Sequence, residues 1–102
     1  MAYRVLRTAA FIERFERFPR DIRGAFEKKI GRLAEDPFAV GKPLRYPYVR
    51  ELRVKGFRVY YFISHRRVIV LLCDASDKKE QQETIDRIIS EKDSLIRLME
   101  KL

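Results

Sequence analysis

The sequence predicts an α+β fold in which helices pack on an antiparallel β-sheet. Two segments with apolar residues at helical spacing come first, three strand-like runs joined by short turns follow, and a long amphipathic helix ends the chain. The chain has 102 residues, of which 46% are hydrophobic, so we expect a single domain over residues 1–102 with one core.

The N-terminal third predicts a strand and a helical hairpin. Residues 3–7 alternate between polar and apolar side chains, which is typical of a short strand. Phenylalanines then recur at helical spacing in a first helix: Phe11, Phe15 and Phe18. Pro19 suits the start of a second helix, which should end before Asp36-Pro37. The apolar face of this second helix is Ile22, Phe26, Ile30 and Leu33. We expect both apolar faces to cover the sheet.

Three strand-like runs follow, at residues 49–54, 57–64 and 68–74. Lys55-Gly56 and residues 64–67 are short enough to be hairpin turns, so the runs should form an antiparallel meander. The third run is apolar almost throughout, which predicts a central strand that is buried on both faces.

The segments on either side of these runs predict a loop and a helix. Residues 41–47 contain one glycine and two prolines, a composition typical of a loop. Asp77 and Glu80 have the spacing of a capping box, which would open the final helix at Lys78. A continuous helix of about 24 residues would be about 36 Å long and would extend past a sheet of this size. Its apolar residues are Ile85, Ile88, Ile89, Leu95, Ile96 and Met99.

The positive charge of the chain is concentrated in one region. The whole chain carries +8, while residues 38–67 hold eight cations against the single acid Glu51, a local charge of +7. A surface of this kind suits a polyphosphate backbone, because Lys and Arg release the condensed counterions of a nucleic acid. The alternative is a solvated basic face without a partner.

Several function classes are excluded by composition. The longest apolar run, residues 68–73, is far too short to cross a bilayer, and the N-terminus lacks the apolar region of a signal peptide. We therefore expect a cytoplasmic protein without membrane contact. The one cysteine, Cys73, excludes an internal disulfide and should be a buried, unreactive thiol. With one histidine as well, we expect no metal site and no cofactor.

Strand alternation predicts which charged side chains meet. Glu51 and Arg53 project to one face of the first run, and Arg58 and Tyr60 project to one face of the second. If the hairpin pairs these two faces, Glu51, Arg53 and Arg58 converge on one side of the sheet.

The chain resembles the RelE/ParE toxin superfamily over nearly its whole length. The resemblance rests on Arg-Glu-Leu-Arg at residues 50–53, Gly-Phe-Arg-Val-Tyr-Tyr at 56–61, the apolar strand after them, and Asp-Lys-Lys-Glu at 77–80. The first and last of these elements are most similar to the HigB-type and phage-derived branch. The resemblance implies a RelE-like fold and a toxin of a type II toxin–antitoxin pair.

Three functions follow from this resemblance. RelE and HigB types cut mRNA on the ribosome, so the first expectation is a ribosome-dependent mRNA endoribonuclease that inhibits translation and that an antitoxin neutralises by covering the basic face. The second is a ParE-like DNA gyrase inhibitor, which needs no proton-transfer groups. The third is a non-catalytic relic that binds RNA or an antitoxin.

Metal-independent RNA cleavage requires a base for the 2′-hydroxyl, cations for the transition state and an acid for the leaving group. The resemblance implies that Arg58 binds the phosphate and that Lys79 is a second catalytic cation. Glu51 occupies the position of the general-base lysine of RelE, and Ile85 occupies that of its catalytic tyrosine and cannot transfer a proton. The expected catalytic residues are Arg58, Glu51, Lys79 and Arg53. The expected RNA-binding residues are Arg45, Arg50, Lys55, Lys78, Arg66 and Arg67.

Several of these residues have alternative roles. Arg58 could form a salt bridge with Glu51, and the two lysines could be merely solvated at a helix start. Tyr60 and Tyr61 offer a phenol, although one of them should be core, and His65 has a suitable pKa for proton transfer but falls at a hairpin tip. The apolar end of the final helix could pack on the helical hairpin, receive an antitoxin helix or bind a second copy as a homodimer. Its residues are Leu95, Ile96, Met99 and Leu102.

Overall fold

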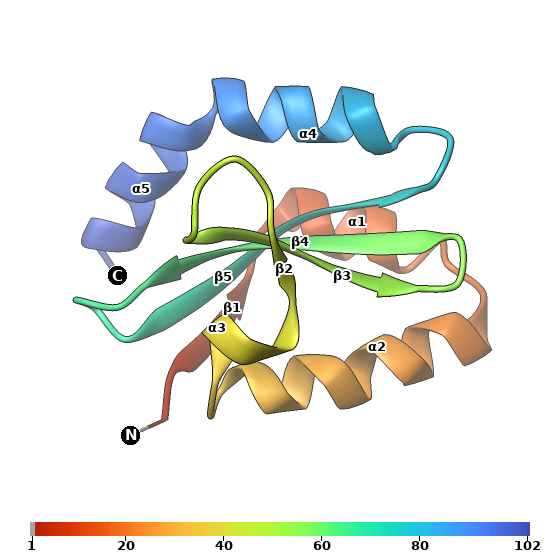
Figure 1. The fold of residues 1–102 in the computed structure, drawn as a ribbon, viewed down its shortest axis with the longest axis horizontal. Helices are drawn as coiled ribbons and strands as arrows, with labels where there is room; N and C mark the ends of the chain where they lie inside the picture. The colour runs from red at the N-terminus through yellow and green to blue at the C-terminus, as the bar shows by residue number, and fades with distance from the viewer. Residues whose placement is uncertain (1) are drawn as a thin grey trace.

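The computed structural model describes residues 2–102, in which a five-stranded sheet is covered by helices on both faces (Figure 1). The strands are β1 (Arg4–Arg7), β2 (Lys42–Pro43), β3 (Val49–Val54), β4 (Phe57–Ser64) and β5 (Ile69–Asp77). The helices are α1 (Ala9–Phe15), α2 (Arg20–Leu33), α3 (Pro37–Val40), α4 (Gln81–Ser90) and α5 (Lys92–Glu100). The predicted α+β fold is confirmed.

The sheet has the order β1-β5-β4-β3-β2. Strands β3, β4 and β5 form the predicted antiparallel meander, and β5 is buried on both faces as expected. The N-terminal strand β1 joins the edge of this mostly antiparallel sheet, where it runs parallel to β5. The chain can run this way because α1 and α2, together with β3 and β4, lie between the two parallel strands in the sequence.

Two apolar cores lie on the two faces of this sheet. The first contains the predicted aromatic face of the helical hairpin, where Phe11, Phe15 and Phe26 pack against Val59 and Tyr61. The second lies under α4 and α5, as the view in Figure 1 shows with the sheet between these helices and α2. Because successive residues of β4 point to opposite faces, this one strand contributes to both cores.

Thr8 joins the first helix to the sheet. Its hydroxyl oxygen accepts a hydrogen bond from the Phe11 N–H at 3.1 Å, which caps α1, and its hydroxyl donates to the backbone carbonyl of Cys73 at 3.1 Å. Cys73 itself is buried, as predicted, and burial raises the pKa of its thiol.

The connection before β3 differs from the predicted loop. It is preceded by the short helix α3, and Lys42–Pro43 form the edge strand β2, which pairs with Arg50 and Glu51 of β3. A strand of two residues that ends in proline leaves few free backbone donors, so it protects the edge of the sheet.

The predicted continuous C-terminal helix is wrong. Residues 78–80 form a turn, because the Lys78 N–H donates to the Gly56 carbonyl at 2.8 Å; the predicted cap of Asp77 on the Glu80 N–H is made at 2.9 Å. The helix then breaks at Glu91, whose φ of −95° and ψ of 5° end α4 and start α5.

This break determines what the apolar end of the last helix packs against. Leu95, Ile96 and Met99 turn back onto the sheet, where Met99 is buried in the second core and the other two are partly buried against it. Of the four residues of this apolar end, Leu102 stays exposed. No helix within residues 2–102 has the length and apolar character to cross a membrane.

Candidate nucleic-acid interface

The β3–β4 hairpin brings the three predicted residues to one face, as the alternation indicated. Arg53 stands directly opposite Arg58, and Glu51 stands opposite Tyr60. Arg58 and Glu51 are therefore diagonal neighbours on the face that α4 covers.

Arg58 is buried with unused hydrogen-bond donors. The residue is 5% exposed, and neither its Nε nor its Nη1 has a hydrogen-bond partner within residues 2–102. The alternative role for Arg58, a salt bridge with Glu51, is not formed among these residues, because Glu51 pairs with Arg53 and Gln81 instead. Leaving a charged donor buried and unsatisfied costs at least about 1–3 kcal/mol, so Arg58 is better suited to an incoming anion than to the free protein.

Glu51 has both carboxylate oxygens engaged. It is 2% exposed; Oε1 accepts from Arg53 Nε at 2.6 Å and Oε2 accepts from Gln81 Nε2 at 3.0 Å. The hydrogen bond to Glu51 raises the pKa of the Arg53 guanidinium, whose side chain is 48% exposed. A general base needs an oxygen that substrate can reach, and this carboxylate is buried with a hydrogen bond on each oxygen, which is the arrangement of a structural ion pair.

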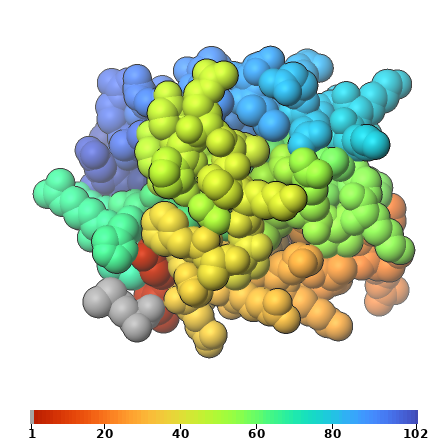
Figure 2. Space-filling view, viewed as in Figure 1, coloured from red at the N-terminus to blue at the C-terminus, as the bar shows by residue number. Residues whose placement is uncertain are grey.

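Three exposed lysines surround the two arginines. Lys55 lies in the β3–β4 turn, and Lys78 and Lys79 follow β5, which the hydrogen bond from Lys78 N–H to Gly56 holds against that turn. On the right of Figure 2 the green turn and the cyan segment meet at one corner of the molecule. We call this group the basic corner: Arg53, Lys55, Arg58, Lys78 and Lys79.

The other predicted RNA-binding residues lie elsewhere. Arg66 and Arg67 are in the β4–β5 turn, at the far end of β4 and about 20 Å from Arg58. Arg45 is exposed in the loop between β2 and β3. Arg50 points to the opposite face of the sheet, where it is buried and donates to the carbonyls of Gly41 at 2.6 Å and Pro47 at 3.1 Å. This placement gives Arg50 a structural role in holding the loop before β3.

One of the two tyrosines is expected to be core, and in the structure both are fully buried. The Tyr60 hydroxyl lies 2.8 Å from Ser76 Oγ, and burial raises the pKa of Tyr60 to about 12. Tyr61 donates to the Pro37 carbonyl at 2.8 Å. The hydroxyl of Tyr3 lies 2.8 Å from Nδ1 of His65, which is at the far hairpin tip, so His65 is remote from the basic corner.

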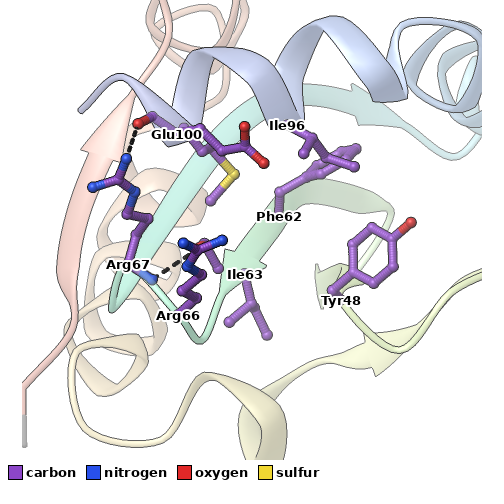
Figure 3. A pocket seen from close by; sticks show the side chains of 9 residues that line it. Tyr48, Phe62, Ile63, Arg66, Arg67, Ile96 and Glu100 are labelled. Carbon is purple, nitrogen blue, oxygen red and sulfur yellow. Dashed lines mark hydrogen bonds between the residues drawn. The ribbon is translucent and has the colours of Figure 1, made fainter.

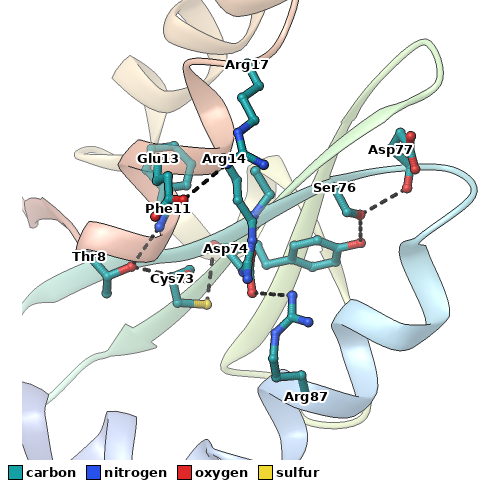
Figure 4. Close-up of polar contacts among 12 residues, drawn as sticks. Thr8, Phe11, Glu13, Arg14, Arg17, Cys73, Asp74, Ser76, Asp77 and Arg87 are labelled. Atoms are coloured by element: carbon teal, nitrogen blue, oxygen red, sulfur yellow. Dashed lines mark hydrogen bonds and ion pairs between the residues drawn. The ribbon is translucent and has the colours of Figure 1, made fainter.

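A buried carboxylate that the sequence did not single out positions the helices around β5. Asp74 Oδ1 accepts from Arg14 of α1 at 2.5 Å, and Oδ2 accepts from Arg87 of α4 at 3.1 Å (Figure 4). This hydrogen bond raises the pKa of the Arg14 guanidinium. The hydrogen bond from Arg87 holds α4 against β5, and Gln81, the first residue of α4, donates to Glu51. No local sequence pattern could reveal the Arg14–Asp74 or the Gln81–Glu51 contact, because the partners are 60 and 30 residues apart.

An apolar pocket, seen from close by in Figure 3, is lined in part by the β4–β5 turn, at the end of β4 that is remote from the basic corner. It has a volume of about 350 Å³ between the β4–β5 hairpin and α5. Tyr48, Phe62 and Ile96 form its apolar walls, and Arg66 and Arg67 lie beside it. The Arg67 guanidinium donates to the backbone carbonyl of Glu100, which ties this hairpin to the end of α5.

No protein-family model matches the chain, and no curated protein sequence is significantly similar to it. Solved structures are similar. A chain of the RelBE2 toxin–antitoxin complex from Mycobacterium tuberculosis is 25% identical, with a TM-score of 0.65, over 76% of this chain and 92% of that chain. A mutant of the Escherichia coli toxin RelE in the free state is 18% identical, with a TM-score of 0.70, over 86% of this chain and 99% of that chain.

A third structure extends this likeness to an archaeal protein. A chain of the RelE–RelB complex from Pyrococcus horikoshii is 14% identical, with a TM-score of 0.63, over 76% of this chain and 97% of that chain. These structures support a similarity to RelE toxins, while the closer similarity to the HigB-type branch stays a prediction. The fold of this chain is that of the RelE toxin superfamily.

Proposed function

We propose that this chain is the toxin of a type II toxin–antitoxin pair and acts in the cytoplasm as a ribosome-dependent mRNA endoribonuclease that inhibits translation. The observation that carries the proposal is Arg58, a buried cation whose Nε and Nη1 have no hydrogen-bond partner among residues 2–102. Because these two nitrogens have no partner there, a phosphate that binds them replaces no hydrogen bond and removes the cost of leaving them unpaired.

The basic corner supplies the positive charge that RNA cleavage needs to stabilise its transition state. Arg58 and Arg53 bind the scissile phosphate and stabilise the charge that develops on it, while Lys79 places a second cation near the leaving oxygen. Lys55 and Lys78 bind the adjacent backbone phosphates. RelE structures with bound RelB are known, and the proposed partner here is likewise an antitoxin.

The proton-transfer groups are the weaker part of this chemistry. Ile85 stands where the resemblance places a tyrosine, and Tyr60 is fully buried. This observation favours a second candidate, a ParE-like inhibitor of DNA gyrase, which would use the same cations without transferring a proton. A non-catalytic relic would keep the basic corner and affect neither target.

Induced expression in cells separates these functions. Wild type should arrest growth and protein synthesis and create new mRNA ends in primer extension, and Arg58→Ala should abolish both effects. Lys28→Ala, which removes an exposed cation from α2 on the opposite face, is the matched control and should behave as wild type. Arrested replication with intact mRNA would identify the gyrase inhibitor, and growth without arrest would identify the relic.

The apolar pocket at the other end supports an acidic antitoxin as the partner. Its walls accept a large apolar side chain, and exposed Arg66 beside it complements a carboxylate on the same segment. The amount of an acidic protein, encoded by the adjacent gene, that co-purifies with the chain should fall about tenfold or more in Arg66→Glu. It should not change in the control Lys28→Glu. Equal retention by both variants would place the antitoxin elsewhere.

A further inference from the structure

The carboxylate of Glu51 binds one edge of the Arg53 guanidinium. It accepts from Nε alone, so this hydrogen bond leaves both Nη groups of the guanidinium free, and the side chain is 48% exposed. Its second oxygen is held by Gln81 at 3.0 Å, which prevents the carboxylate from turning away. Glu51 thus fixes one edge of the Arg53 guanidinium and presents the other.

Arg53 would not otherwise remain beside Arg58. The two arginines are directly paired across β3 and β4, where like charges repel and Cβ atoms are about 5 Å apart. Two acids are diagonal neighbours of Arg58 on this face, Glu51 on β3 and Asp74 on β5. Asp74 accepts from Arg14 and Arg87, whereas Glu51 accepts from Arg53. A guanidinium fork on each strand at this separation can reach oxygens of the same phosphate.

We propose that Glu51 and Gln81 are positioning residues that hold Arg53 beside Arg58, so that both guanidinium groups bind one RNA phosphate. The inference rests on the proposed function, since RNA supplies that phosphate. It assigns Glu51 a role other than the general base that its place in the sequence implied, because both carboxylate oxygens are engaged and buried.

The test measures the affinity of a short single-stranded RNA at several salt concentrations. Arg53→Ala should weaken binding about tenfold and reduce the slope of log affinity against log salt by about 0.7, the value for one phosphate contact. Glu51→Ala should do the same, although it removes a negative charge, and Glu51→Gln should restore binding because its amide oxygen can still accept from Arg53 Nε. Gln81→Ala should give an intermediate loss.

The double variant Arg53→Ala/Glu51→Ala should bind no more weakly than Arg53→Ala alone, because the two residues act as a unit. Lys28→Ala is the control for a lost surface cation. Thermal unfolding of each variant shows whether the fold is intact, and the isosteric Glu51→Gln keeps the test valid if Glu51→Ala is unstable.

Opposite results would overturn the proposal in recognisable ways. Tighter binding by Glu51→Ala, with a steeper slope, would make Glu51 an electrostatic competitor of RNA. Unchanged binding with lost cleavage and an altered pH profile would make it the general base. Failure of wild type to bind RNA better than Arg58→Ala would reject the proposed function as well.

A measurement without RNA separates these failures. In nuclear magnetic resonance spectra, the Arg53 Nε–H should exchange slowly in wild type and in Glu51→Gln, and quickly in Glu51→Ala. Slow exchange without RNA binding would keep the contact but reject its role in holding a phosphate. Fast exchange in wild type would reject the positioning itself.

Discussion

Arg50 and Arg58 are two buried arginines on adjacent strands, and they differ in role because their surroundings differ. Arg50 lies on the face of α2 and α3 and donates to two loop carbonyls, which leaves its Nε unpaired. Arg58 lies on the face of α4, and both its Nε and its Nη1 lack a partner within residues 2–102. The first satisfies backbone groups that would otherwise be unpaired. The second has unpaired donors that an anionic ligand would satisfy.

The two arginines should therefore respond in opposite ways to replacement by methionine, an apolar residue of similar length. Arg58→Met should raise the free energy of unfolding by about 1 kcal/mol while it abolishes the proposed RNA binding. Arg50→Met should lower the free energy of unfolding by about 1–3 kcal/mol, because it leaves the Gly41 and Pro47 carbonyls without their donor. Urea denaturation of both variants measures this difference, and equal destabilisation would show that Arg58 is a structural residue.

Tyr60 predicts a loss of stability at high pH. Its phenol has a pKa near 10.0 in the unfolded chain and about 12 in the folded protein, where burial disfavours the charged form. Unfolding therefore releases a proton between these values, so the stability that Tyr60 contributes is complete below about pH 10 and is lost toward about pH 12. Tyr61 and Cys73, whose pKa values burial also raises, add to this loss.

Urea denaturation of wild type and Tyr60→Phe along this pH range isolates the contribution of Tyr60. The variant should be less stable than wild type near neutral pH, because Ser76 loses a hydrogen-bond donor, and the difference should shrink as the pH rises. A constant difference up to about pH 12 would show that the Tyr60 phenol does not titrate in this way.

At the scale of elements, the break between α4 and α5 determines the second core. It returns Met99 to the sheet, where the residue is 2% exposed, and leaves its neighbour Leu98 42% exposed. The two residues differ in burial although they are adjacent in one helix, so they form a matched pair for testing how α5 packs.

Met99→Ala should destabilise the protein by about 2–4 kcal/mol, through lost burial and the cavity left behind. Leu98→Ala should change stability by less than about 0.5 kcal/mol, since it removes exposed surface. Chemical denaturation provides both values. Similar small effects would indicate that α5 is not held on the sheet in solution.

The sequence predicts those elements whose causes are local. The spacing of apolar residues predicts α1 and α2, although Phe18 lies in the turn after α1 and not in the helix. The short Lys55-Gly56 turn fixes the register that sets Arg53 opposite Arg58. The break at Glu91 has no proline or glycine to signal it, because α5 turns back through tertiary packing of Met99. Gln81 and Asp74 were likewise missed, since their partners are distant in the sequence.

For the whole molecule, the two cores are not independent units. Both lie against the same strands, with Tyr61 of β4 in the first core and Tyr60 in the second. Loss of either core exposes one face of β4, so neither should survive without the other, and residues 1–102 should behave as one domain.

Equilibrium unfolding should therefore be a single cooperative transition. Since the sequence has five tyrosines and no tryptophan, tyrosine fluorescence and far-ultraviolet circular dichroism are suitable probes, and their transitions should coincide. Met99→Ala should shift both curves equally, although it touches only the second core. Two separate transitions would mean that the faces unfold independently.

The burial of Cys73 has a practical consequence for work on this protein. The chain contains one cysteine, and its thiol is enclosed in the second core with a raised pKa, so alkylating reagents should leave the folded protein unmodified. A fluorophore could then be attached at a single introduced thiol, for example in Lys28→Cys, with Cys73 left in place. Encounters of the labelled protein with ribosomes or an antitoxin could be followed in real time on an otherwise native chain.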